Sequence, residues 1–190
     1  MCAALFLAAV ALAAASKRPS TRDLFWPDEF SMSFVTATNS SFASFGQLSF
    51  SRKFDATRID HSAGAYECMH FYNTTSACTL FMSAAGLSRV LHRTGDCCVD
   101  NPSIHSTDGR WMINSTFVGV TTVAERPCNV WNGEHVYLSD VATNRPCAFT
   151  FPPAPPQNYQ FLFHTWNATP KLTSQFMNPP AGCTTLCSAQ

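Results

Sequence analysis

The sequence predicts one all-β domain, with at most one short helix, built from about ten antiparallel strands that form a curved sheet, a barrel or a sandwich. Three observations lead to this prediction. Apolar and polar residues alternate in several short runs, which is typical of half-buried strands. Turn-forming residues separate these runs. Helical spacing is confined to the stretch Leu172 to Met177, which Pro179 and Pro180 end.

The length and charge of the chain restrict its class. Its 190 residues suffice for a single domain with its own core and are too few for two ordinary domains. Lys and Arg total 12, Asp and Glu also total 12, and the formal net charge is therefore zero. Because no basic run provides the electrostatic footprint that nucleic acid requires, we expect no nucleic-acid partner.

The first fifteen residues carry no charged side chain and end in Ala13-Ala14-Ala15, a small-residue pattern typical of signal cleavage. We interpret residues 1–15 as a cleaved secretory signal. The alternative, a membrane anchor, requires roughly twenty apolar residues, and this stretch has about thirteen. We expect residues 16–27 to be a loose leader and residues 28–190 to form the domain.

No other stretch is apolar for long enough to span a bilayer, so we expect no membrane span. Sequons for N-glycosylation support a secretory route; their acceptors are Asn39, Asn73, Asn114 and Asn167. We therefore expect a glycoprotein that is secreted to the cell exterior or delivered to the lumen of a lysosome-like compartment.

Eight cysteines remain once Cys2 leaves with the signal: Cys68, Cys78, Cys97, Cys98, Cys128, Cys147, Cys183 and Cys187. An even number in a secreted chain predicts four disulfides. The alternative is a zinc site, which usually shows two Cys-x-x-Cys-like pairs that this chain lacks. We expect disulfides, no metal and no cofactor.

Two local arguments address the pairing. If residues 66–82 form a hairpin with its turn at Asn73, Cys68 and Cys78 face each other across the strands, a geometry that suits a disulfide. Cys97 and Cys98 are adjacent, and neighbouring side chains of a strand point to opposite faces. We expect these two to bond different partners and to tie two layers to one strand.

The strands that we predict carry an apolar face. Phe30, Met32 and Phe34 alternate with serines, and Leu48 and Phe50 do the same one run later. In the C-terminal half, Asn132-Gly133 predicts a two-residue type I′ hairpin turn. Residues 159–164 predict a last strand after the proline-rich stretch 152–156. The inward-facing positions are Phe30, Met32, Phe34, Leu48, Phe50, Ile59, Phe161 and Phe163.

Several short motifs follow one another between about residues 28 and 187: Gly46 to Phe50, Arg58-Ile59-Asp60, Cys68, Cys78 to Phe81, Gly86, Cys97-Cys98, Trp111, Val118-Gly119, Cys128 to Trp131, Tyr137, Pro146 and Phe176 to Cys183. Their order resembles that of the ependymin-related secreted proteins, including relatives in protists and plants.

The resemblance implies a strongly curved antiparallel sheet, or half-barrel, similar to that of bacterial periplasmic lipoprotein carriers. It also implies a homodimer and a lipid or other hydrophobic ligand on the concave face. Calcium binding is not carried over, because no acidic cluster here would supply the oxygen ligands.

We expect a non-enzymatic protein that binds a hydrophobic, lipid-like molecule through the inward-facing positions given above. The simplest alternative role for those side chains is to fill the core. The alternative function is an adhesive or structural glycoprotein that acts through protein contacts and glycans. A secreted hydrolase is a weaker alternative, because the six histidines are scattered and no catalytic motif accompanies them. We predict no catalytic residue.

Overall fold

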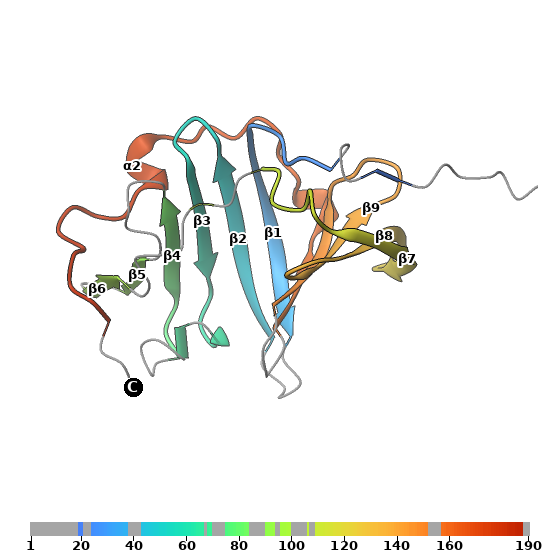
Figure 1. Cartoon of the computed structure of the whole chain (residues 1–190). Helices are drawn as coiled ribbons and strands as arrows, with labels where there is room; N and C mark the ends of the chain where they lie inside the picture. The colour runs from blue at the N-terminus through green and yellow to red at the C-terminus, as the bar shows by residue number, and fades with distance from the viewer. Residues whose placement is uncertain are drawn as a thin grey trace, which may run out of the picture.

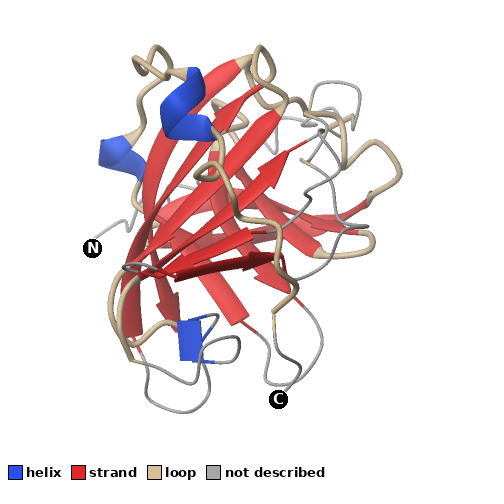
Figure 2. Ribbon diagram, turned by 90° about the vertical axis from the view of Figure 1, so that its left-hand side faces the viewer, coloured by secondary structure: helices blue, strands red, loops and turns tan. Residues whose placement is uncertain are grey.

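The computed structural model describes residues 19–20, 24–37, 43–66, 68–69, 75–83, 90–93, 96–99, 106, 109–151 and 157–187. These residues form one open antiparallel sheet (Figures 1 and 2). Its strands are β1 Glu29–Ala37, β2 Ala43–Ser51, β3 Ala56–His61, β4 Cys78–Ser83, β5 Val90–Arg93, β6 Asp96–Val99, β7 Thr116–Val123, β8 Arg126–Asn132, β9 Val136–Asp140, β10 Pro146–Phe151 and β11 Gln157–Phe161.

The strand order is β6-β5-β4-β3-β2-β1-β11-β10-β9-β8-β7. The chain therefore winds outward from β1 to one edge at β6, crosses to the opposite edge at β7, and winds back until β11 pairs with β1. The two edges do not pair, so the predicted curved, disulfide-stapled antiparallel sheet is confirmed in its open form. The end of the crossing from β6 to β7, at Trp111 and Met112, packs against the core.

Alternation in β1 and its neighbours produces the core, as predicted. Phe30, Met32 and Phe34 are fully buried, and Met32 lies opposite Leu48 of β2. Leu48 in turn faces Ile59 of β3, so one apolar row crosses the strands on a single face. On the other side of β1, Phe34 faces Phe161 of β11. Complete burial of each such side chain contributes roughly 1.5 to 3 kcal/mol to folding.

The C-terminal segment covers the opposite face beside β3 and β4. It contains the short helix α2, Ser174–Met177, whose Thr173 hydroxyl caps the first turn by accepting from the Phe176 amide. Cys183 is buried against Phe81 of β4 and Val99 of β6. Beyond it, an isolated parallel bridge joins Val99 to Leu186. The segment thus lies along the β6 edge.

Four disulfides pair the eight cysteines: Cys68–Cys78, Cys97–Cys183, Cys98–Cys187 and Cys128–Cys147. The expectation that Cys97 and Cys98 bond different partners is confirmed. Both partners belong to the same C-terminal segment, however, so the two bonds fasten that segment to β6. They do not tie two separate layers to one strand, and that part of the expectation is wrong.

The Cys68–Cys78 pair is confirmed, but its predicted hairpin geometry is wrong. Cys68 lies in a helical turn in which the Met69 amide donates to the Ala65 carbonyl, and Cys78 lies opposite His61 of β3. The disulfide therefore attaches this turn to β4. Asn73, the expected tip of the hairpin, lies outside the described residues.

Two turn predictions are also corrected. Asn132 pairs with Val136, so the β8–β9 hairpin has a three-residue loop, Gly133 to His135, and no Asn-Gly type I′ turn. Two consecutive residues with positive φ occur in the β7–β8 hairpin instead, at Ala124 (46°) and Glu125 (64°), between the paired residues Val123 and Arg126. Strand twist selects that conformation there although neither residue favours it intrinsically.

The predicted last strand ends early. After Phe161 the chain enters the 3-10 helix η2, Phe163–Thr165, and Phe163 lies outside the apolar row. The core also begins within the expected leader, because Leu24 and Trp26 are buried. Residues 1–15, the proline-rich stretch 152–156, Asn39 and Asn73 lie outside the described residues, whereas Asn114 and Asn167 are exposed.

Candidate functional site

The concave face brings together seven of the eight side chains that we predicted as a ligand surface. Phe30, Met32, Phe34, Leu48, Phe50, Ile59 and Phe161 are all buried in one cluster. The eighth, Phe163, is only partly buried but packs against the same cluster. The seven side chains pack mainly against one another and against residues that cover them, so in this structure they form the floor of the concave face.

Two segments cover this floor. The N-terminal segment contributes Leu24 and Trp26, and the end of the crossing from β6 to β7 contributes Trp111 and Met112. A backbone hydrogen bond of 3.1 Å from the Trp26 amide to the Gly109 carbonyl joins the two segments. Trp111, at the end of this crossing, is partly buried and packs against the same core cluster, so it lies over the concave face.

Beside the floor lies a group of packed rings, which we call the aromatic cluster: Trp26, Trp111, His135, Tyr137 and Phe149. Trp111 is its centre. Its ring centroid lies 5.8 Å from that of Trp26, 5.5 Å from that of Tyr137 and 5.2 Å from that of Phe149. All three contacts are edge-to-face, the arrangement that the charge distribution of aromatic rings favours.

The aromatic cluster contains polar atoms that lack a hydrogen-bond partner among the described residues. They are Nε1 of Trp26, Nε1 of Trp111 and the hydroxyl of Tyr137. Tyr137 is almost completely buried. Each buried donor without a partner costs about 1 to 3 kcal/mol. By contrast, the indole N–H of Trp131 has a partner. Trp131 lies on β8, next to the strand of Tyr137, and it donates to the Ser139 hydroxyl at 2.9 Å.

Burial also determines the protonation of the cluster. Desolvation raises the pKa of the Tyr137 phenol far above its ordinary value. The neighbouring Trp26 indole opposes this shift in part, although its N–H and the phenol oxygen do not meet hydrogen-bond geometry. The phenol therefore stays neutral and keeps its O–H donor. Desolvation lowers the pKa of His135 below its ordinary 6.5, with a smaller opposing effect from the Glu134 carboxylate. At neutral pH the cluster is thus uncharged.

Trp26 was not predicted as a site residue from the sequence, and Trp111 entered only as a matching position of the resemblance. A signal was present. Trp and Tyr carry a polar group on an apolar body, and a buried one normally finds a partner for that group. The chain has four Trp residues, and each is a position where burial of the ring raises the question of a partner for its N–H group. The pattern of alternation alone does not register them, because Trp26 and Trp111 lie outside strands.

Among the residues that the structure describes, no group of three or more His, Cys, Asp or Glu side chains is placed to hold a metal ion. Within the same residues, no helix has the length and apolar character needed to cross a bilayer.

Comparison with known proteins bears on the fold. No protein-family model matches the chain, and no curated protein matches it. Among solved structures, the fold is similar to that of an uncharacterised conserved protein from Thermus thermophilus, with a TM-score of 0.55 over 87% of this chain and 96% of that one. The two sequences are 8% identical, so the likeness concerns the fold alone.

Proposed function

We propose that this protein binds a hydrophobic, lipid-like molecule that carries an oxygen acceptor, and that the ligand lies between the aromatic cluster and the floor of the concave face. The observation that carries the proposal is the set of donors without partners in the cluster, the N–H groups of Trp26 and Trp111 and the O–H of Tyr137. An ester or carboxyl oxygen of a ligand would accept from them, while its apolar part contacts the rings.

The covering segments supply an entry route for this ligand. Trp26 and Trp111 belong to irregular segments, which the backbone hydrogen bond from Trp26 to Gly109 joins over the face. Displacing them leaves every ladder hydrogen bond of the sheet in place. We propose that ligand entry moves Trp26 and Trp111 outward while β1, β2 and β3 keep their positions.

The proposal also covers the class of the protein and the compartment in which it acts. We propose a secreted, non-enzymatic glycoprotein related to the ependymin-related proteins. Its four disulfides support an oxidising compartment, the cell exterior or a lysosome-like lumen. Glycosylation would use exposed acceptors such as Asn114.

An adhesive or structural role is the second candidate, because Val118 and Val120 are exposed on β7, an outermost strand of the sheet. Exposed apolar residues on an outer strand favour pairing with another chain. In this case the protein would self-associate as a homodimer and carry no lipid.

Native mass spectrometry of the secreted protein, followed by organic extraction, separates the two candidates. A mass excess that extraction removes supports lipid binding, and a lipid-free dimer supports the adhesive role. The extracted protein is then titrated with oleic acid, with tryptophan fluorescence as the signal.

The variant Tyr137→Phe removes the unpartnered hydroxyl and keeps the ring. We expect it to weaken oleic acid binding by about tenfold, the effect of one lost hydrogen bond to a carboxylate. The matched control is Tyr66→Phe, which removes a tyrosine hydroxyl outside the aromatic cluster and should leave binding unchanged. Equal affinity in all three proteins, or no fluorescence change with oleic acid, contradicts the proposed site.

A further inference from the structure

A second group of side chains lies at the margin of the core and combines two arginines with two rings that pack against the core cluster. We call Arg126, Phe163, Arg145 and Trp166 the arginine ladder. The guanidinium carbon of Arg126 lies 3.9 Å from the centroid of the Phe163 ring. That of Arg145 lies 5.6 Å from the Phe163 centroid and 5.3 Å from the Trp166 ring. Both cations are thus held on aromatic faces.

The ladder is assembled from segments far apart in the sequence. Arg126 begins β8, Arg145 directly precedes β10, and the two rings come from η2 and the residue after it. The position of Trp166 is fixed by the core, because its ring stacks on that of Phe30 with centroids 4.9 Å apart and an interplanar angle of 18°. The ladder therefore has a rigid base in the core of the protein.

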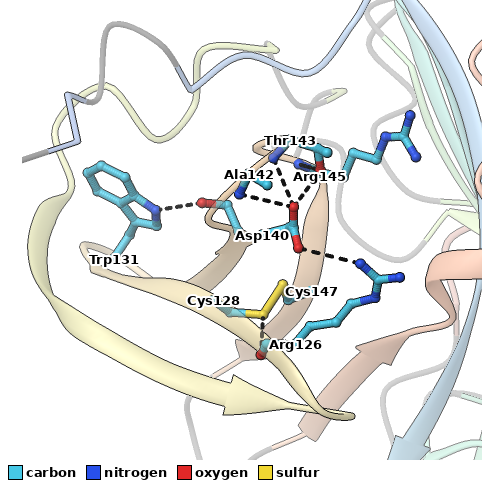
Figure 3. Close-up of a disulfide and its surroundings, with 9 residues drawn as sticks. Arg126, Cys128, Trp131, Asp140, Ala142, Thr143, Arg145 and Cys147 are labelled. Carbon is cyan, nitrogen blue, oxygen red and sulfur yellow. Dashed lines mark hydrogen bonds and ion pairs between the residues drawn. A yellow bond between two sulfur atoms is a disulfide. The ribbon is translucent and has the colours of Figure 1, made fainter. Parts of the chain in front are cut away.

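The two arginines differ in their ionic partners (Figure 3). Arg126 lies 3.8 Å from the buried carboxylate of Asp140. The other carboxylate oxygen of Asp140 accepts from the amides of Ala142 and Thr143 and from the Thr143 hydroxyl. The charge of Asp140 is therefore shared between Arg126 and the turn. Among the described residues, no carboxylate forms an ion pair with Arg145.

Arg145 lines a groove of about 410 Å³. The other lining side chains that matter here are Phe25, Trp26, Thr143, Asn144 and Trp166. Phe25 is half exposed, although a Phe side chain normally gains free energy by burial. The groove therefore offers a cation without an ionic partner among the described residues, exposed aromatic surface, and a hydroxyl and an amide from the turn that Asp140 organises.

We infer that this groove binds an acidic sugar, a pyranose ring that carries a carboxylate. A guanidinium whose face lies on a ring directs its N–H edge outward, where it can donate two parallel hydrogen bonds to a carboxylate. The apolar C–H face of a pyranose fits against Phe25 and Trp166, and its hydroxyl groups suit the polar turn at Thr143 and Asn144. Trp26 lines this groove and also belongs to the aromatic cluster, but Arg145 and Phe25 do not, so variants at these two residues test this site without removing a donor of the proposed lipid site.

The probe is glucuronic acid, titrated into the ¹⁵N-labelled full protein while the indole N–H signal of Trp166 and the Nε–H signal of Arg145 are followed by NMR. Glucose tests the need for the carboxylate, and acetate tests the need for the sugar ring. We expect glucuronic acid to shift both signals, and both comparison compounds to bind at least about tenfold more weakly.

Arg145→Gln should weaken glucuronic acid binding by about tenfold. Arg126→Gln is the matched control. Arg126 also lies on the Phe163 ring, but it does not line this groove, so the loss of its charge should change affinity less than about twofold. Phe25→Ala, a change at a half-exposed ring, should also weaken binding and serves if Arg145→Gln misfolds.

Three results would overturn the inference. If glucose binds as tightly as glucuronic acid, the carboxylate is not recognised. If acetate binds as tightly as glucuronic acid, the site takes an adventitious ion only. If both Arg145→Gln and Phe25→Ala keep the affinity of the unaltered protein, glucuronic acid binds elsewhere.

Discussion

Arg58 and Asp60 form a two-point ion pair on the outer face of β3, with Nη2–Oδ1 and Nε–Oδ2 distances of 2.7 and 2.9 Å. The pair does more than join two neighbours on one strand. The third nitrogen of Arg58, Nη1, donates to the Phe176 carbonyl at 2.8 Å, and the guanidinium lies 4.0 Å from the centre of the Phe176 ring. Asp60 fixes the orientation of the guanidinium, and the guanidinium in turn joins the C-terminal segment to the sheet through Phe176.

We predict that Arg58→Ala lowers the free energy of unfolding by about 2 kcal/mol, since a half-buried cation with a charge-assisted pair, a carbonyl acceptor and stacked rings is lost. The control is Arg52→Ala. Arg52 pairs with Asp28 at 3.2 Å, but both side chains are largely exposed, so we expect a loss below about 1 kcal/mol. Urea unfolding measures both. Equal losses would contradict the role given to Arg58.

The two disulfides of the C-terminal segment should contribute to the free energy of unfolding in a strongly non-additive way. Cys97–Cys183 and Cys98–Cys187 span 86 and 89 residues, so they close nearly the same loop. Either bond alone restricts the unfolded chain almost as much as both. We predict that replacing one pair by alanine costs little, whereas replacing both pairs costs about 4 to 5 kcal/mol. Denaturant unfolding of the three variants checks this, and additive losses would count against it.

Gly46 should not tolerate a side chain. A Cβ at this position would lie 2.5 Å from the Asp60 carbonyl oxygen and would also overlap the Phe34 ring. Because a backbone carbonyl in a strand pair cannot move aside cheaply, we predict that Gly46→Ala costs about 3 kcal/mol. Gly119→Ala is the control in β7, where a Cβ meets nothing within 4 Å, and should change stability by less than about 0.5 kcal/mol. Thermal unfolding that fails to separate the two variants would refute the prediction.

Tyr137→Phe should stabilise the ligand-free protein. The change removes a buried hydroxyl that has no partner among the described residues and keeps the ring in its edge-to-face contact with Trp111. We expect the free energy of unfolding to rise by about 1 kcal/mol. Calorimetry of the extracted protein measures this. A loss of stability would show that the hydroxyl is satisfied within the protein and would remove the main support for the proposed ligand.

His135 should make stability fall slightly in mild acid. Burial lowers its pKa below 6.5 in the folded protein, so just below pH 6.5 the unfolded chain binds more protons at this site. The contribution of His135 to the free energy of unfolding is therefore present above pH 6.5, decreases as the pH falls toward the folded pKa, and then levels off. The melting temperature of His135→Gln relative to the unaltered protein, followed from about pH 7.5 to 4.5, isolates the effect. A difference that does not vary with pH would contradict it.

The local sequence pattern was sufficient to predict a structural feature wherever that feature depends on one short segment. Alternation placed Phe30, Met32 and Phe34 on one buried face, because the two-residue period of a strand is a property of its backbone. The adjacency of Cys97 and Cys98 was enough to exclude a bond between them. The helical turn before Pro179 was recognisable for the same reason, since the helical spacing and the proline stop are both local.

The pattern of the amino-acid sequence was sufficient to predict the class of fold and the buried face of the central strands. It also predicted the Cys68–Cys78 pair, although from a hairpin that the structure does not contain. Tertiary structure alone decided that Cys68 lies in a helical turn, that the positive φ angles fall at Ala124 and Glu125, and that Phe163 leaves the apolar row to contact Arg126. It also decided that Trp26 and Trp111 cover the concave face. These outcomes depend on the twist of the sheet, on the path of the chain between the two sheet edges and on packing between residues distant in the chain. A local pattern of apolar and polar residues contains no information about these three factors.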